Sequence, residues 1–345
     1  MLFQDMNIDD LVKLTKDKGV VTIDVRSPSE FADATIPGSV NIPFFDDAER
    51  AEIGTIYKQD SVKAAMDRGL EIFSAKLPAF IKQFEKIQGP KAVFCWRGGM
   101  RSKTSATVLS LMGIKVHRLT GGFRAYRRWV VETLEGIDFK PRHVVLLGNT
   151  GTGKTEILRQ LKQEGFPVLD LEGMAGHRGS VFGHVGMKAH NQKTFDSLLV
   201  TELLQWQRSS YVLLEGESKR IGKVVLPEVI MDKREQAAQL FIQLPLEERV
   251  RHIVADYQPS EHKQALMEGF KHIKGRIHTP IAKEIMASLE SEQYEQAVKL
   301  LLEHYYDPRY EHAMQQYGTD ITIIQANTIA DAVQDVKDYI ARKFK

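Results

Sequence analysis

The chain has 345 residues, 43% of them hydrophobic, which is enough for two domains with separate cores. Its formal net charge of +2 gives no indication of a strongly basic nucleic-acid-binding protein. No apolar run could span a bilayer, the first residues lack a secretory signal pattern, and the single cysteine excludes an internal disulfide, so we expect a cytoplasmic protein without membrane contact.

The first 136 residues alternate short apolar runs with helical patterns. Strands are expected at 20–25, 91–95 and 115–119. Helices are expected to begin near Pro28, to cover 61–88 with Pro78 as a place for a kink, to run from a cap at Ser102 to about Met112, and to cover 123–135. This alternation is typical of an α/β domain with a mainly parallel sheet, predicted over 1–136.

The second predicted domain covers 137–345 and begins with a linker that ends near Arg142. Its strands are expected at 143–147, 168–170, 211–215, 239–243 and 321–325. A helix is expected from Thr155 to about Glu164, and a long helical stretch over 246–316. The pattern predicts a P-loop-type parallel α/β domain with a helical C-terminal part.

The one cysteine opens a short loop with the sequence C-W-R-G-G-M-R. Cys95 follows a predicted strand, and the glycines at 98 and 99 allow the backbone to curl around an anion. Arg97, Arg101 and the dipole of the next helix would stabilise a thiolate. We therefore predict that Cys95, Arg97 and Arg101 are catalytic, with a buried structural cysteine as the alternative.

A second loop, G-N-T-G-T-G-K-T, matches the phosphate-binding pattern and lies between a predicted strand and a predicted helix. The residues expected to bind a diphosphate are Gly148, Gly151, Gly153, Lys154 and Thr155. Thr155 could also hold Mg²⁺, together with Asp170 and Glu215 at the ends of later strands. Because a glutamate stands where a nucleotide hydrolase usually has an aspartate, diphosphate binding is better supported than ATP hydrolysis, and ATP binding stays open.

Glycines also fill the segment 173–183, which carries His177 and Arg178. This segment follows the second strand of the predicted sheet, at the edge where ligands bind in such domains. We expect His177 and Arg178 to contact a transferring group or a leaving diphosphate. The alternative is a surface loop without a ligand.

A basic cluster in the helix that closes the first domain is the candidate RNA contact. Its members are Arg124, Arg127 and Arg128. Tyr126 and Trp129 lie beside them and could stack on bases, although aromatic residues at helical spacing usually belong to a core.

The segment D24-V-R-S-P-S-E-F-A-D-A-T-I-P-G-S-V-N-I-P43 resembles the rhodanese signature, and the cysteine loop lies where a rhodanese nucleophile belongs. The loop is one residue longer than the usual C-x-x-G-x-R and in this respect resembles rhodanese-like phosphatases. The extra width leaves room for a tetrahedral phosphorus centre, as in selenophosphate. Asp24 and Arg26 are expected to brace the loop.

Both loops together, in this order, make the whole chain similar to the tRNA 2-selenouridine synthase family. The resemblance implies a bacterial cytoplasmic transferase that converts wobble 2-thiouridine to 2-selenouridine in the anticodon region of tRNA. It further implies selenophosphate as donor, geranyl diphosphate as co-substrate for an S-geranyl intermediate, and a selenophosphate-supplying enzyme as a partner. Whether Cys95 forms a perselenide or only positions selenophosphate stays open.

Three other functions remain compatible with the sequence. The chain could be a sulfurtransferase fused to an ATP-dependent kinase that acts on a small metabolite. It could be a sulfur carrier whose P-loop domain is a nucleotide-gated binding module. A rhodanese-like phosphatase is the third, although no acidic residue lies between Cys95 and Arg101 to act as a local acid.

Overall fold

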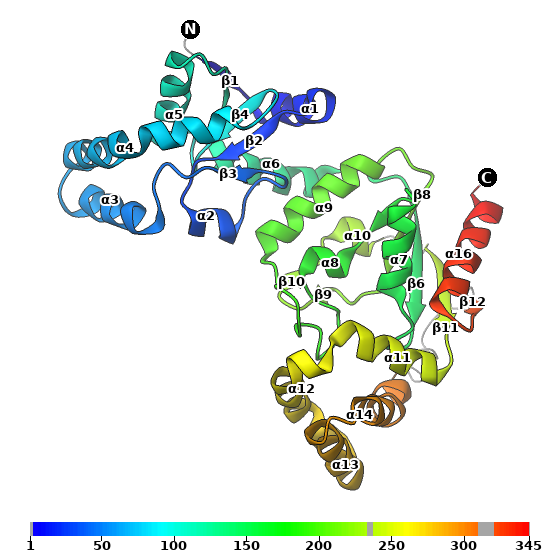
Figure 1. The fold of residues 1–345 in the computed structure, drawn as a ribbon. Helices are drawn as coiled ribbons and strands as arrows, with labels where there is room; N and C mark the ends of the chain where they lie inside the picture. The colour runs from blue at the N-terminus through cyan, green and yellow to red at the C-terminus, as the bar shows by residue number, and fades with distance from the viewer. Residues whose placement is uncertain (1–2, 233–236, 310–320, 345) are drawn as a thin grey trace. The chain divides into compact units, whose positions relative to one another are not determined.

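The computed structural model describes residues 3–232, 237–309 and 321–344. The chain divides into two compact units, shown as a ribbon in Figure 1. The first comprises Met1–Gly136 with Asp196–Leu198, and the second comprises Ile137–Phe195 with Leu199–Lys345. Within the described ranges, no helix has the length and apolar character needed to cross a membrane.

The first unit is built on a five-stranded parallel sheet with the order β1-β5-β4-β2-β3. Its strands are β1 (Gln4–Met6), β2 (Val21–Asp24), β3 (Val40–Asn41), β4 (Lys91–Phe94) and β5 (His117–Leu119). Its helices are α1 (Ile8–Lys18), α2 (Pro28–Asp33), α3 (Asp47–Gln59), α4 (Val62–Glu85), α5 (Met100–Leu111) and α6 (Gly122–Gly136). The predicted elements are all present, and β1, α1, β3 and α3 are additional to the prediction.

Aromatic side chains fill much of the core of this unit. Phe44 stacks on Phe73 with ring centroids 3.6 Å apart, and Phe80 contacts both rings edge-on. Helix α4 supplies Phe73 and Phe80 from one face and continues through Pro78. Because strands β2 and β4 are buried among these rings, their loops leave the sheet from a rigid base.

The second unit contains another five-stranded parallel sheet, with the order β12-β11-β6-β8-β7. Its strands are β6 (Arg142–Gly148), β7 (Val168–Leu169), β8 (Tyr211–Glu215), β11 (Ala238–Gln243) and β12 (Ile321–Gln325). The helices of this part are α7 (Lys154–Gln163), α8 (Leu171–Ala175), α9 (Gln192–Trp206), α10 (Glu228–Met231) and α16 (Ile329–Lys343). A short antiparallel pair, β9 (Arg220–Ile221) and β10 (Val224–Val225), was not predicted.

The predicted helical stretch is a separate layer of the second unit. It consists of α11 (Leu246–Tyr257), α12 (Pro259–Ile273), the 3₁₀ turn η1 (Lys274–Arg276), α13 (Thr279–Glu290), α14 (Tyr294–Leu301) and the π-helix η2 (Leu302–Tyr306). These helices share an apolar core of their own. The part of the prediction beyond residue 309 lies outside the described residues.

Candidate active sites

Cys95 directly follows β4, and its side chain is only 3% exposed. Its Sγ lies 3.2 Å from the hydroxyl oxygen of Ser102. Helix α5 begins at Met100 with Gly99 as its N-cap, so the prediction that Ser102 caps the helix is wrong. Because Gly99 takes the N-cap position, the helix begins before Ser102. Ser102 instead lies in the first turn, where its hydroxyl contacts the thiol of Cys95.

The cysteine loop is fixed by close backbone contacts with the start of α6. Gly98 has a φ of +64°, and a Cβ there would lie 2.8 Å from the backbone nitrogen of Gly121. A Cβ on Gly122 would lie 2.2 Å from the carbonyl oxygen of Cys95. The N–H of Phe123 donates to that carbonyl at 2.8 Å. Neither Gly98 nor Gly122 can therefore be replaced without moving the loop.

Arg101 is held by an ion pair with Glu30. Its two terminal nitrogens donate to the two carboxylate oxygens at 2.5 Å and 3.2 Å. Burial raises the pKa of Glu30, but the hydrogen bond and charge of Arg101 outweigh it, so the pKa lies below its usual value. The positive charge of Arg101, which was predicted to stabilise a thiolate, is thus already paired with the carboxylate of Glu30.

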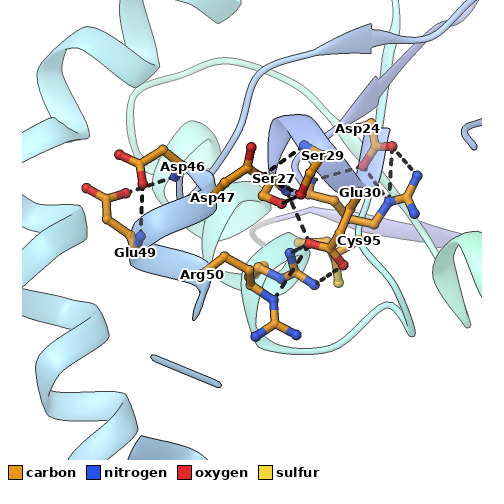
Figure 2. A network of polar contacts seen from close by, with 12 residues as sticks. Asp24, Ser27, Ser29, Glu30, Asp46, Asp47, Glu49, Arg50 and Cys95 are labelled. Carbon is orange, nitrogen blue, oxygen red and sulfur yellow. Dashed lines mark hydrogen bonds and ion pairs between the residues drawn. The ribbon is translucent and has the colours of Figure 1, made fainter. Parts of the chain in front are cut away.

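An open pocket of about 910 Å³ is lined by residues of the cysteine loop and by both partners of this ion pair. Arg97 is exposed at its edge, and Arg50 from α3 lines it with Nε 3.7 Å from Glu30. Figure 2 shows Glu30, Arg50 and Cys95 close together. Glu30 and Arg50 were not predicted from the sequence. The Glu-Phe pair of the signature segment was the available signal, and it pointed to Glu30 only.

Asp24 and Arg26 form a buried ion pair, with side chains 0% and 2% exposed. Arg26 also donates to the carbonyl of Ala34 at 2.6 Å, and its guanidinium lies 4.2 Å from the ring centre of Phe123. The N–H of Phe123 donates to the carbonyl of Cys95, so the ion pair of Asp24 and Arg26 supports the cysteine loop through Phe123. These contacts agree with the expected bracing role.

The phosphate loop connects β6 to α7, at the carboxyl end of the central strand of the second sheet. Gly148, Gly151 and Gly153 all have positive φ values, of 149°, 85° and 71°. The ammonium group of Lys154 donates to the carbonyl of Gly148 at 2.8 Å. The loop therefore has the tight curl that lets backbone N–H groups and the start of α7 surround a phosphate.

Thr155, the first candidate for Mg²⁺ binding, donates its hydroxyl to the carboxylate of Glu172 at 2.7 Å. Glu172, which lies in α8 two positions after Asp170, was not predicted from the sequence. Asp170 lines the cavity at the phosphate loop. Its carboxylate also caps α8 by accepting a hydrogen bond from the N–H of Gly173 at 2.7 Å.

Glu215 is buried at the end of β8 and accepts a hydrogen bond from the N–H of Leu171 at 3.2 Å. Burial, followed by the charges of Asp170 and Glu172, raises the pKa of Glu215 well above its usual value. The described residues contain no group of three or more His, Cys, Asp or Glu side chains placed to hold a metal ion. Mg²⁺ in phosphate sites needs only one or two carboxylates besides the phosphates, so Thr155 and Glu172 fit it.

The side chains of the neighbouring residues Arg178 and His177 lie in different surroundings, and only Arg178 lines the phosphate-loop cavity. Arg178 lines the phosphate-loop cavity, pairs with Asp256 at 2.6 Å and lies over the ring of Tyr257 at 4.6 Å. His177 packs under Gly183, where a Cβ would lie 2.7 Å from its ring, and it is not among the residues that line the cavity. Burial, then the charges of His184 and Arg178, lowers its pKa. His177 therefore stays an untested candidate.

The cavity at the phosphate loop measures about 490 Å³. The predicted residues that line it are Gly148, Gly151, Gly153, Lys154, Thr155, Asp170 and Arg178. Arg249, which the sequence analysis missed, is buried behind the loop, where its Nε donates to the carbonyl of Thr150 at 2.9 Å. It also pairs with Asp307 at 2.6 Å, so a residue far along the chain fixes the loop.

The candidate RNA contacts on α6 differ in their surroundings. Arg124 and Arg128 are exposed, whereas Arg127 is partly buried in an ion pair with Asp196. Tyr126 is 3% exposed, and burial raises its pKa to about 12. Tyr126 therefore belongs to a core, which is the usual place of aromatic residues at helical spacing, and is not available to stack on bases.

Comparisons with known proteins match both parts of the chain. The family model described as the tRNA 2-selenouridine synthase AAA domain matches residues 141–283, and the rhodanese-like domain model matches residues 7–128. The second match confirms the predicted rhodanese-like domain. A tRNA 2-selenouridine synthase of Nitrosomonas europaea is 35% identical over 260 residues, or 73% of this chain and 67% of that protein. One from Cupriavidus necator is 30% identical over 332 residues, or 86% of this chain and 89% of that protein.

Proposed function

This chain belongs to the tRNA 2-selenouridine synthase family, and we propose that it converts wobble 2-thiouridine in tRNA to 2-selenouridine in two steps. It is a tRNA-modifying transferase with a role in forming selenouridine. In the proposed first step geranyl diphosphate alkylates the sulfur of the base. In the second step selenium from selenophosphate replaces the resulting geranylthiol group.

The second unit performs the first step in this proposal. The thiouridine sulfur attacks the first carbon of the geranyl chain, the carbon–oxygen bond breaks, diphosphate leaves, and the base loses its N3 proton to solvent. Lys154 and the backbone of the phosphate loop bind the diphosphate, and Arg178 faces the same cavity. Mg²⁺ held through Thr155 and Glu172 would neutralise part of the leaving group's charge.

The first unit performs the second step. Selenium of selenophosphate bonds to carbon 2 of the uridine ring, the bond from carbon 2 to sulfur breaks, and the leaving geranylthiolate takes up a proton from solvent. Hydrolysis of the phosphorus–selenium bond then releases phosphate. The pocket at Cys95 suits this donor because Arg50, Arg97 and Arg101 line it and attract an anion with several charges. The Cys95 thiol, which lines the same pocket, supports the replacement of geranylthiol by selenium. An incoming donor competes with Glu30 for the terminal nitrogens of Arg101.

One observation supports the proposal: each unit has a pocket lined by basic side chains at the carboxyl end of its own parallel sheet. One site holds a buried thiol and the other a phosphate loop. A single-step sulfurtransferase would need only the first of them. The pair matches a reaction with one co-substrate that carries a diphosphate and another that carries phosphorus and selenium.

The experiment that tests this proposal is mass spectrometry of nucleosides from an anticodon stem-loop that carries 2-thiouridine. The full chain is given geranyl diphosphate and selenophosphate, separately and together. We expect geranylated uridine with the first donor alone and selenouridine with both. An intact but unmodified stem-loop, with turnover of ATP in the same preparation, would favour the kinase-fused sulfurtransferase instead.

A further inference from the structure

A second, apolar cavity of about 60 Å³ adjoins the phosphate-loop cavity in the second unit. The two cavities share four lining residues, Thr150, Ile253, Tyr257 and Tyr306. The adjoining cavity then extends among α11, α12, α13, α14 and η2. Thr150 belongs to the phosphate loop itself, so the apolar cavity lies next to the loop that would bind a phosphate.

The walls of this cavity carry hydrocarbon side chains on nearly every side. They include Phe182, Leu266, Leu289, Val298, Leu301 and Leu302. The smallest lining residue, Ala297, is fully buried on α14. Such walls favour an apolar ligand, since a polar group placed there would lose its hydrogen bonds to water without replacement.

The size of the cavity limits what can enter. A site on this scale holds roughly four or five water-sized groups, because one such group needs about 10–15 Å³ on the same measure. A single branched five-carbon unit has about that bulk. A nucleoside does not fit, since it is much larger than a cavity of about 60 Å³.

We propose that this cavity binds the far end of a short branched hydrocarbon chain whose diphosphate lies on the phosphate loop. This inference rests on the proposed function and adds to it the residues that select the chain length. The part of the chain nearer the diphosphate passes Ile253, Tyr257 and Tyr306 in the shared wall. Ala297 and Leu301 line the part of the cavity outside the shared wall.

Two neighbouring leucines of α14 provide a matched test. Leu301 lines the cavity, whereas Leu300 is buried in the same helical core and does not line it. Both Leu301→Ala and Leu300→Ala remove the same atoms from the same core. Only Leu301→Ala should enlarge the cavity, and Ala297→Leu should fill it.

The measurement is calorimetric binding to the full chain of inorganic diphosphate and of dimethylallyl, geranyl and farnesyl diphosphates. The unmodified protein should bind geranyl diphosphate at least about 100-fold more tightly than inorganic diphosphate, since even two buried methylenes worth about 10-fold each give that factor. Leu301→Ala should improve farnesyl diphosphate binding about 10-fold relative to geranyl diphosphate. Leu300→Ala should leave the order of the four ligands unchanged.

Ala297→Leu should weaken geranyl diphosphate binding about 10-fold or more, with inorganic diphosphate bound as before. If this variant fails to fold, the leucine pair still decides the question. The inference is overturned if the unmodified protein binds inorganic and geranyl diphosphate equally well, or if both leucine variants change ligand order alike. Failure of every diphosphate to bind would instead overturn the proposed function.

Discussion

Arg101 and Glu30 lie 71 positions apart, yet the arginine donates to both carboxylate oxygens of the glutamate, at 2.5 Å and 3.2 Å. The pair connects the first turn of the helix after the cysteine loop to α2. Glu30 also accepts from the N–H of Ser27 in a capping box, so the carboxylate has a fixed position. Arg101 is thereby preorganised beside the thiol, and an anion that binds there must displace a carboxylate.

The variant Glu30→Gln tests this relationship through the pH dependence of stability. The folded pKa of Glu30 lies below its ordinary value of 4.5, so its ionisation stabilises the fold above that pH. This contribution is lost as the pH falls from 4.5 through the lowered folded pKa. The difference in the free energy of unfolding between wild type and variant should therefore shrink across this acid window.

Urea unfolding at a series of pH values measures that difference. Asp67→Asn is the control, since Asp67 forms an exposed pair with Lys63. A constant difference between wild type and Glu30→Gln at all pH values would show that the carboxylate is not held by Arg101.

Removing the buried partner of Arg26 should have a large effect on stability. The variant Asp24→Ala leaves the guanidinium buried without its carboxylate, which typically costs about 3–5 kcal/mol of unfolding free energy. The exposed pair of Lys63 and Asp67 is the comparison, where Lys63→Ala should cost about 1 kcal/mol or less. Equal losses in the two variants by chemical denaturation would contradict the bracing role of Asp24 and Arg26.

The variant Cys95→Ser should separate the two steps of the reaction. It keeps the size of the side chain and the contact with Ser102 but removes the thiol. We expect selenouridine formation to fall at least about 100-fold, the scale of losing a nucleophilic or anion-stabilising group, with geranylation unchanged. Quantification of both nucleosides in one reaction provides the internal control. Loss of geranylation as well would contradict the division of work between the units.

Two exposed arginines on α6 should contribute to RNA binding. If Arg124 and Arg128 each neutralise one phosphate, the double variant to alanine should reduce the slope of log affinity against log salt by about two. Lys140→Ala is the control, since Lys140 is 78% exposed and pairs with Asp138. Fluorescence anisotropy of a labelled tRNA over a salt series gives the slopes. An unchanged slope would place the RNA contacts elsewhere.

Local sequence signals predicted the parts of both sites that depend on backbone shape. Gly148, Gly151 and Gly153 have the positive φ values that the phosphate-loop pattern requires, and Cys95 stands at a strand end as expected. A glycine at the helix start displaced Ser102 from the predicted cap into the first turn.

Contacts between distant segments could not be predicted in the same way. Glu172 and Arg249 reach their partners through the packing of separate segments, which no spacing in the sequence encodes. The signature segment contains Glu30 but does not identify Arg101 as its partner. The local composition around Tyr126 indicated a basic helix but did not show which face is buried.

The central claim is that the phosphate loop serves only the first step. Lys154→Ala removes the ammonium group that donates to the carbonyl of Gly148 in the loop. With selenophosphate and a stem-loop that already carries S-geranyl-2-thiouridine, this variant should produce selenouridine at nearly the wild-type rate. With the 2-thiouridine stem-loop and both donors it should produce almost none. Failure of Lys154→Ala on the geranylated stem-loop, with Lys162→Ala active as the surface control, would contradict the account.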